Sequence, residues 1–268
     1  MKDVQSSIDQ RGISIQRVGI KEACLPFLIK TKEGGYQQVV ARACFTVALP
    51  MEYKGTHMSR FLEILNPWSK KPVAEPELAE ILQEALDRLQ AESASIRIDF
   101  KYFVDRTAPV SGRQSVLDVD CFFAGDMEQG GGLRFTLGVR LPYTSLCPCS
   151  KEISRYGAHN QRGSMAVQVR FQPEFECILI EDLVELMEKQ ASCQIYPLLK
   201  REDEKFVTEK AYENPKFVED ILRDGVLALR GLQGIQWFSL ECENFESIHN
   251  HSAYAAHEEA VAYKHTKK

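Results

Sequence analysis

The segment between residues 141 and 163 concentrates side chains that could do chemistry. Cys147, Cys149 and His159 supply two thiols and an imidazole, which are groups that bind metals or transfer protons. Cys147 and His159 lie twelve positions apart. That separation lets a thiolate and an imidazole converge on one borderline cation such as zinc. A long connection this rich in reactive groups is typical of a functional loop.

The spacing also leaves a plain alternative open. Cys-x-Cys is a weaker metal signal than paired Cys-x-x-Cys motifs, and a connecting loop with ordinary thiols and a surface histidine has the same letters. A redox function fits less well, because the thioredoxin-type motif has two residues between its cysteines and precedes a helix. The pattern alone favours neither the metal site nor the plain loop.

Three further segments carry charged or titratable groups. Residues 201–210 and the pair Glu219-Asp220 form charge runs, which are most often solvated faces. Residues 241–251 combine acidic residues with two histidines, which fits proton transfer, metal binding or a merely polar strand end. His57 stands at an expected helix N-terminus, a place that favours phosphate. Together these segments predict a metal-assisted hydrolase that acts on a phosphorylated substrate.

The elements that must position these groups form two similar halves. Hydrophobic periodicity predicts, in the first half, strands over residues 17–30, 36–49, 96–104 and 115–123 and helices over residues 57–66 and 76–89. In the second half it predicts strands over residues 133–141, 165–171, 235–245 and 252–263 and helices over residues 181–190 and 215–229. The order of elements recurs, and a run of three glycines separates the halves. We therefore expect an α+β fold of two tandem units, residues 1–130 and 131–268, each an antiparallel four-stranded sheet with two helices on one face.

Composition narrows the class of protein. The chain has 268 residues, of which 44% are hydrophobic and 26% charged, so it has enough apolar material for a globular core. Its net charge of -5 argues against nucleic-acid binding. No apolar run approaches the roughly 18 residues of a membrane span, and the N-terminus is polar, so we expect a cytoplasmic protein without a membrane partner. Its eight cysteines are expected to be free thiols, and the sheet edges to be covered by oligomerisation.

Four longer motifs identify a family that the chain resembles. They are SLCPCSKEIS (residues 145–154), GAHNQRG (residues 157–163), GTHMSRF (residues 55–61) and ESIHNH (residues 246–251). They closely resemble the prokaryotic GTP cyclohydrolase type IB family over nearly the whole chain. The resemblance implies the tunnelling fold and a homotetramer with active sites at subunit interfaces. It also implies conversion of GTP and water to formate and 7,8-dihydroneopterin triphosphate, the first step of tetrahydrofolate synthesis.

The resemblance further implies a divalent metal, which is zinc, manganese or iron, held by Cys147, His159 and Glu204. Water activated by this metal would attack C8 of the guanine ring. Glu219 matches the family's guanine anchor, and a carboxylate is suited to accept hydrogen bonds from both N1–H and the exocyclic amine.

The remaining site residues divide into two groups. Those that match the family's proton-transfer residues are Cys149, Glu246 and His249. Those that offer cationic or imidazole groups to the triphosphate are Lys151, Arg162, Arg60 and His57.

Two alternatives stay open at this point. One is an archaeal-type relative that uses Fe(II) and makes a cyclic phosphate of dihydroneopterin. The other is a non-enzymatic module in which zinc, bound by Cys147 and His159, only stabilises a loop.

Overall fold

The structure is a computed structural model that describes residue 5 and residues 7–261. The described residues up to Lys101, together with residues 121–137, form one compact unit. Residues 102–120, together with residues 138–261, form a second compact unit. The boundary after residue 130 that the sequence suggests marks a repeated order of elements rather than a contact cluster, and it stays a prediction.

The α+β class is confirmed: the described residues contain nine strands and six helices. The strands are β1 (Ile15–Lys30), β2 (Tyr36–Leu49), β3 (Pro72–Val73), β4 (Ser93–Thr107), β5 (Gln114–Glu128), β6 (Arg134–Leu146), β7 (Asn160–Phe171), β8 (Ile235–Asn244) and β9 (Ala253–Ala260). The helices are α1 (Met58–Trp68), α2 (Glu75–Leu89), α3 (Pro148–Ile153), α4 (Ile180–Glu188), α5 (Arg201–Glu213) and α6 (Val218–Arg230). Hydrogen bonds connect the strands in the order β3-β1-β2-β4-β5-β6-β7-β8-β9.

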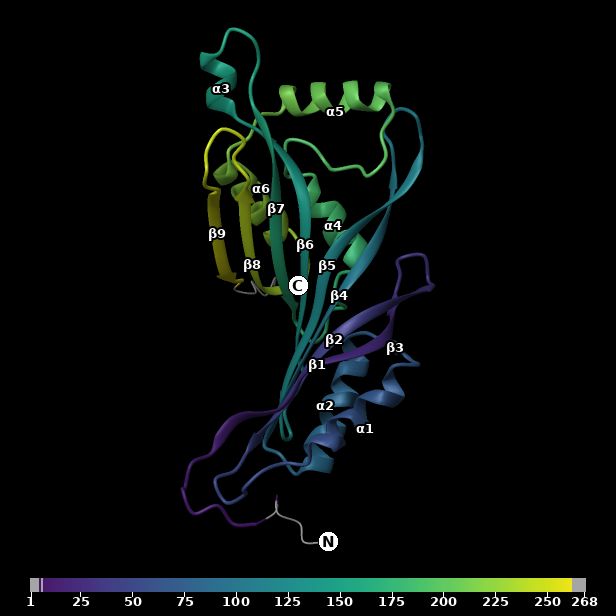
Figure 1. Cartoon of the computed structure of the whole chain (residues 1–268), viewed down its shortest axis with the longest axis vertical. Coiled ribbons are helices and arrows are strands. Elements are labelled where there is room, and N and C mark those ends of the chain that lie inside the picture. Colours follow the sequence, from purple (N-terminus) through teal and green to yellow (C-terminus); the bar gives the residue numbers. More distant parts are fainter. Residues whose placement is uncertain (1–4, 6, 262–268) are drawn as a thin grey trace, which may run out of the picture. The chain divides into compact units, whose positions relative to one another are not determined.

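In the first unit, α1 and α2 cover one face of the strands (Figure 1). Alternate residues of β2 are buried beneath them, which is the period of two that the sequence shows. Phe45 of β2 meets Phe61 of α1 edge to face, with ring centroids 5.3 Å apart. The apolar stripe expected on the second helix is buried in α2, at Leu78, Ile81, Leu82 and Ala85.

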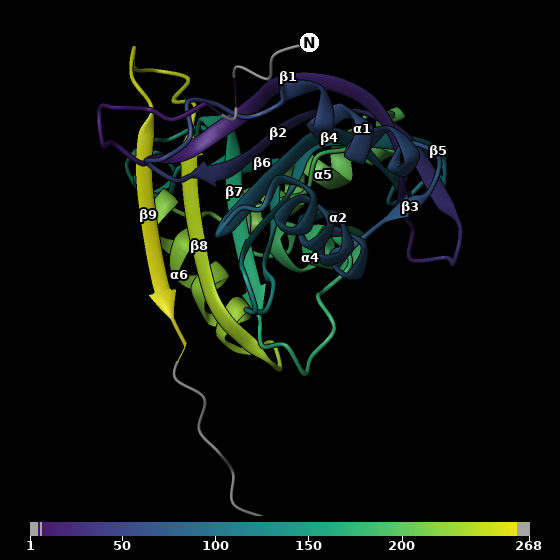
Figure 2. The ribbon, with the colours of Figure 1, turned by 90° about the horizontal axis from the view of Figure 1, so that it is seen from below.

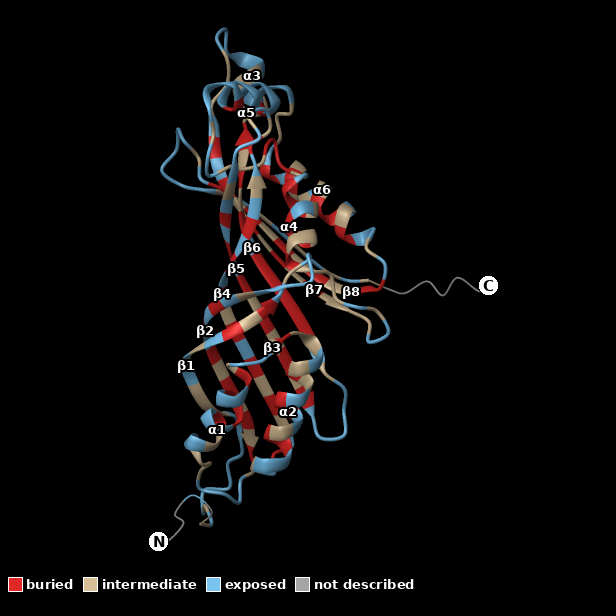
Figure 3. Cartoon of the chain, turned by 90° about the vertical axis from the view of Figure 1, so that its right-hand side faces the viewer, coloured by how far each residue is buried: buried red, intermediate tan, exposed pale blue. Residues whose placement is uncertain are grey.

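In the second unit, α6 packs along β8 and β9 (Figure 2). Gly225 allows this close approach, because a Cβ at that position would lie 2.5 Å from Leu240 Cδ2 of β8 and 3.0 Å from Met187 Cε of α4. Along most strands in Figure 3 the buried positions alternate with intermediate or exposed ones, so one face of the sheet is covered. The core of this unit is therefore a sheet face closed by α4 and α6.

Some boundaries differ from the sequence expectation. Helix α1 does not end before Pro67 but continues to Trp68, because a proline in the last turn removes only one helical hydrogen bond and Trp68 is buried. The six-residue helix α3 and the thirteen-residue helix α5 replace what the sequence suggested were irregular segments. Strand β9 ends at Ala260, and the expected continuation over residues 262 and 263 lies outside the described residues.

A glycine beside the site accepts a buried aromatic ring. A Cβ on Gly163 of β7 would lie 2.3 Å from Cζ of Tyr143, a fully buried residue of β6. The Tyr143 hydroxyl donates to Asn244 Oδ1 at 2.6 Å, and the Asn244 amide donates to Ser145 Oγ at 3.1 Å. Burial, reinforced by the nearby Cys242 and Glu243, raises the pKa of Tyr143, so the hydroxyl remains a donor.

We predict that Gly163→Ala lowers the free energy of unfolding by about 1–3 kcal/mol, because Tyr143 has to move out of its packed position. Gly132→Ala is the matched control, since nothing lies within 4 Å of a Cβ there, and it should change the value by less than about 0.5 kcal/mol. Urea denaturation measures both. Equal effects of the two substitutions would contradict the close packing of Tyr143 on Gly163.

Candidate active site

Cys147 lies between the end of β6 and the start of α3. It is the N-cap of α3, and its Sγ accepts a hydrogen bond from the Ser150 N–H at 3.4 Å. Pro148 occupies the first helical position, where a missing N–H removes no helical hydrogen bond. The thiol is therefore held in one orientation by the helix that it begins.

The backbone brings His159 back to Cys147. The Cys147 N–H donates to the His159 carbonyl at 3.1 Å. Ser150 Oγ donates to the Cys147 carbonyl at 3.1 Å and accepts from the His159 N–H at 3.2 Å. The connection that contains α3 is thus closed at its base, where the backbones of Cys147 and His159 are hydrogen-bonded.

Two neighbouring side chains fix the tautomer of His159. Its Nδ1 lies 2.9 Å from Gln161 Oε1 and 3.3 Å from Ser247 Oγ. The amide of Gln161 donates to Glu246 Oε1 at 3.2 Å. Because a carboxylate only accepts, the NH₂ group must face Glu246 and the amide oxygen must face His159. His159 then carries its proton on Nδ1 and keeps Nε2 as a lone-pair donor, the form in which histidine binds metals.

The same contacts tie the segment after β8 to this point. Glu246 and Ser247 belong to residues 245–252, and the Phe245 N–H also donates to the Arg162 carbonyl at 2.9 Å. His249 stacks on His251 in this exposed segment, with ring centroids 5.1 Å apart. The structure therefore brings Glu246 into the neighbourhood of His159 and places His249 on the same loop.

Sequence reasoning assigned no role to Gln161 or Ser247, although both lie inside the quoted motifs. Gln161 is 7% exposed, so it is a polar side chain buried at the start of a strand. The available signal was the alternation of β7, which places Gln161 on the same face as the buried Gly163 and Met165.

Glu204 stands in the first turn of α5, where its side chain is exposed. Among the residues that the structure describes, no three His, Cys, Asp or Glu side chains converge closely enough to hold a metal ion. The donor chemistry nevertheless fits one, because a thiol, an imidazole with a free Nε2 and a carboxylate suit zinc, manganese or iron.

Asp203 precedes Glu204 and is fully buried. Burial by itself would raise the pKa of its carboxyl, but hydrogen bonds from Ser111 and from the backbone of Lys200 and Val110 lower that pKa well below its usual range. It is therefore a carboxylate that serves structure rather than one that exchanges protons.

Glu219 lines a small open pocket at the start of α6. The cavity has a volume of about 290 Å³ and is lined by Phe217, Glu219, Asp220 and Arg223. Asp220 is engaged with the backbone, since its Oδ2 accepts from the Phe217 N–H at 3.1 Å. The Glu219 carboxylate is exposed beside an aromatic ring, an arrangement that suits a planar base with two donor groups.

The expected triphosphate cations have different surroundings. Lys151 Nζ donates to the Tyr212 carbonyl at 2.5 Å and lies 4.3 Å from the centre of the Tyr212 ring. Arg162 is exposed on β7. His57 and Arg60 belong to the first unit, at the start of α1, where Arg60 Nη1 donates to the Arg88 carbonyl at 3.4 Å.

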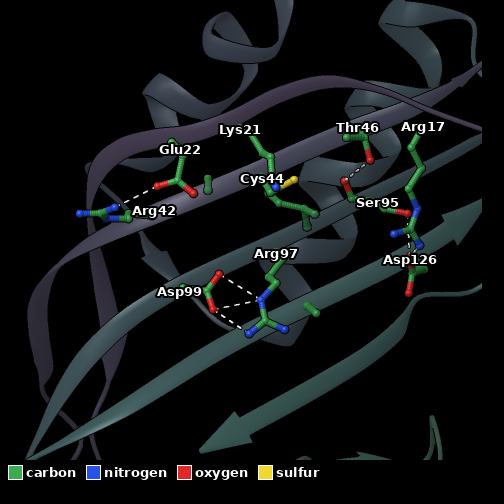
Figure 4. Close-up of a pocket in the computed structure, with 13 residues that line it drawn as sticks. Arg17, Lys21, Glu22, Arg42, Cys44, Thr46, Ser95, Arg97, Asp99 and Asp126 are labelled. Carbon is green, nitrogen blue, oxygen red and sulfur yellow. Dashed lines mark hydrogen bonds and ion pairs between the residues drawn. The ribbon is translucent and has the colours of Figure 1, made fainter.

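A larger cavity of about 610 Å³ lies on the strands of the first unit and contains none of the predicted site residues (Figure 4). Its floor is made of small side chains such as Cys44 and Ser95. Its rim is ionic, and oppositely charged side chains pair across it, as Arg42 does with Glu22 at 2.9 Å. The three arginines of the lining are each paired with a carboxylate, and Lys21 is the fourth basic side chain.

Comparison with known proteins identifies the family. The family model described as type I GTP cyclohydrolase folE2 matches residues 1–255. This chain belongs to that family. Among curated members, GTP cyclohydrolase FolE2 of Geobacter sulfurreducens is 52% identical over 259 residues, covering 97% of this chain and 98% of the relative. The FolE2 protein of Geotalea uraniireducens is 51% identical over 256 residues, covering 96% and 92% of the two chains.

Solved structures confirm the tunnelling fold. A uricase from Bacillus fastidious superimposes with a TM-score of 0.54 at 8% identity, covering 94% of each chain. A uricase from Arthrobacter globiformis gives a TM-score of 0.50 at 7% identity, covering 94% of this chain and 95% of the uricase. At such identities the likeness concerns the fold alone. Within the part of the chain that the structure describes, no helix is long and apolar enough to cross a membrane.

We predict that Cys149 and Cys242 differ sharply in reactivity. All eight cysteines are free thiols; Cys149 is exposed on α3, whereas Cys242 is fully buried in β8. Burial raises the pKa of Cys242 to about 12, so almost none of it is thiolate at pH 8. Iodoacetamide followed by peptide mass spectrometry should therefore modify Cys242 at least ~100-fold more slowly than Cys149. Comparable rates would show that β8 is accessible.

Proposed function

We propose that this chain is a GTP cyclohydrolase that converts GTP and water to formate and 7,8-dihydroneopterin triphosphate, the first step of tetrahydrofolate synthesis. Its family membership and its relatives named GTP cyclohydrolase FolE2 support the reaction. The observation that carries the proposal is the hydrogen-bonded series from His159 through Gln161 to Glu246. It couples an imidazole that is ready to bind a metal to a carboxylate that is able to move protons.

In this proposal Cys147, His159 and Glu204 hold zinc, manganese or iron. When bound, the metal supplies Lewis-acid activation of water near neutral pH. Gln161 and Ser247 keep the proton of His159 on Nδ1. The lone pair of Nε2 is then available to bind the metal. The Ser150 N–H orients the Cys147 sulfur.

Glu219 anchors the substrate base. Guanine presents N1–H and an exocyclic amine along one edge, and a carboxylate accepts from both at once. The Phe217 ring lies at the same pocket and offers an apolar surface to the base. A base held along this edge leaves C8, on the opposite side of the purine, available for attack.

Proton transfers are assigned to Glu246, His249 and Cys149. Two carbon–nitrogen bonds at C8 must break before formate leaves, so the ring nitrogens have to receive protons in turn. Glu246 uses Oε1 to accept from Gln161 and retains Oε2 for a second partner. His249 is exposed, and an imidazole is suited to cycle between acid and base at neutral pH.

The triphosphate is assigned to Lys151, Arg162, Arg60 and His57. Arg162 is exposed and can offer its planar guanidinium directly. Lys151 would have to exchange the Tyr212 carbonyl for phosphate oxygens. A homotetramer in the cytoplasm belongs to the same proposal: β9 is an edge strand among the described residues, which favours pairing with another subunit, and the eight free thiols suit a reducing compartment.

We predict that the purified protein releases formate from GTP, and that Cys147→Ala and His159→Ala each abolish this release, because each removes one of three metal donors. Cys24→Ala, which removes an exposed thiol of β1, is the control and should retain activity. Chromatography of the product should show the triphosphate. A cyclic phosphate would instead indicate the archaeal-type reaction, and full activity of a ligand variant with stoichiometric metal would exclude that ligand.

We predict that Glu219→Gln lowers GTP turnover by ~10³-fold or more while zinc content stays unchanged. The amide offers one acceptor to two guanine donors and turns its NH₂ group toward them. Glu209→Gln, the same change on the exposed face of α5, is the control. Loss of zinc rather than of turnover in Glu219→Gln would remove this residue from the anchor role.

A further inference from the structure

Helix α5 has almost no apolar face with which to hold its position. Of its thirteen residues, the two that are buried are Asp203 and Ala211. Its large aromatic side chains remain exposed to solvent, Phe206 to 40% and Tyr212 to 39%. Figure 3 shows the helix as mostly exposed. Hydrophobic burial, which usually fixes a helix on a domain, therefore contributes little to placing α5.

A buried carboxylate, that of Asp203, holds α5 in position instead of an apolar face. Asp203 is 0% exposed. Its Oδ1 accepts from the N–H groups of Val110 and Ser111, both at 2.8 Å. Its Oδ2 accepts from Ser111 Oγ at 2.6 Å and from the Lys200 N–H at 2.8 Å. Charge-assisted bonds of this kind are stronger than neutral ones, and all of them converge on the first turn of α5.

The turn that binds Asp203 is itself held by backbone hydrogen bonds. Val110 and Ser111 form the turn between β4 and β5, which is closed by hydrogen bonds from Ala108 N–H to the Arg113 carbonyl at 2.9 Å and from Gly112 N–H to the Ala108 carbonyl at 3.2 Å. The carboxylate thus joins the start of a helix to the end of a long hairpin. Replacing the carboxylate by an amide would keep one acceptor oxygen and turn an NH₂ group toward the two donors at the other oxygen.

The next residue along the helix is the one assigned to the metal. The Glu204 N–H donates to the Lys200 carbonyl at 2.9 Å, and the Lys200 N–H donates to Asp203. The backbone of Glu204 is consequently held through Lys200 by the same carboxylate. The other end of α5 is tied to α3 by Lys151 and Tyr212, and α3 begins at Cys147 (Figure 1).

We propose that Asp203 is a positioning residue that sets Glu204 for metal binding by fixing the first turn of α5 to the β4–β5 turn. This inference rests on the proposed function, because it takes Glu204 as a metal ligand. Asp203 itself does not touch the metal or GTP. Its effect on zinc passes entirely through the side chain that follows it.

A double-mutant cycle on zinc affinity tests the proposal. We would measure the dissociation constant of Zn²⁺ by competition with a chromophoric chelator for the full-length protein and for Asp203→Asn, Glu204→Gln and the double variant. Asp203→Asn should weaken zinc binding by ~10-fold or more, as loss of a group that orients a ligand does. Glu204→Gln should weaken it further, and the double variant should be no weaker than Glu204→Gln alone.

Two variants complete the design. Glu202→Gln removes the same charge one position earlier, from an exposed side chain, and should leave zinc affinity unchanged. Ser111→Ala removes one of the bonds to Oδ2 and should cause a smaller loss that also disappears in the Glu204→Gln background. If Asp203→Asn does not fold, the cycle of Ser111→Ala with Glu204→Gln gives the same readout.

The outcomes separate the two claims. Equal weakening by Asp203→Asn in the wild-type and Glu204→Gln backgrounds would overturn the positioning role, since the effect would not pass through Glu204. Unchanged affinity in both Asp203→Asn and Ser111→Ala, with a loss in Glu204→Gln, would overturn it as well and leave the ligand assignment standing. Unchanged affinity in Glu204→Gln would remove the ligand itself, and with it this inference.

Discussion

The hydrogen bond from the Cys147 N–H to the His159 carbonyl is the constraint on which the candidate site depends. It closes a connection that holds a short helix and an exposed loop, so that the end of β6 and the start of β7 stay adjacent. Ser150 adds a second closure from inside, through its hydroxyl. Cys147 and His159 then follow β6 and precede β7 directly, where Ser150 orients the thiol and Gln161 and Ser247 orient the imidazole.

The candidate site also depends on the orientation of the Gln161 side-chain amide. Gln161 has two different ends, and Glu246 decides which of them faces His159. Neither a carboxylate nor an aliphatic side chain at position 161 could donate to Glu246 and accept from His159 at the same time. The tautomer of the histidine is therefore determined two residues away from it in sequence and, through Glu246, by a loop some 85 residues further along.

Strict alternation and helical stripes were sufficient to predict the fold class and most strands, because β2, β4 and α2 each bury one clear face. The helix α5 escaped prediction for the opposite reason: it buries a carboxylate instead of an apolar stripe, and its charge run is typical of a solvated segment. The motifs located Cys147, His159 and Glu246. Spacing could not reveal Gln161 as the link between His159 and Glu246, since that link depends on a contact between β7 and the segment after β8. The roles of Glu204, Glu219 and the triphosphate cations stay predictions.

The weak apolar packing of α5 has a consequence for the order in which the molecule comes apart. Elements with few buried apolar contacts open at lower free energy than the core sheet, as separate cooperative units. A ligand carried on α5 would thus be released by a local opening while β6, β7 and their closed connection remain intact. Thermal inactivation would then begin with the reversible detachment of α5 and of the Glu204 carboxylate that it carries. Excess metal binds the form in which α5 is attached, so it would delay this inactivation through mass action.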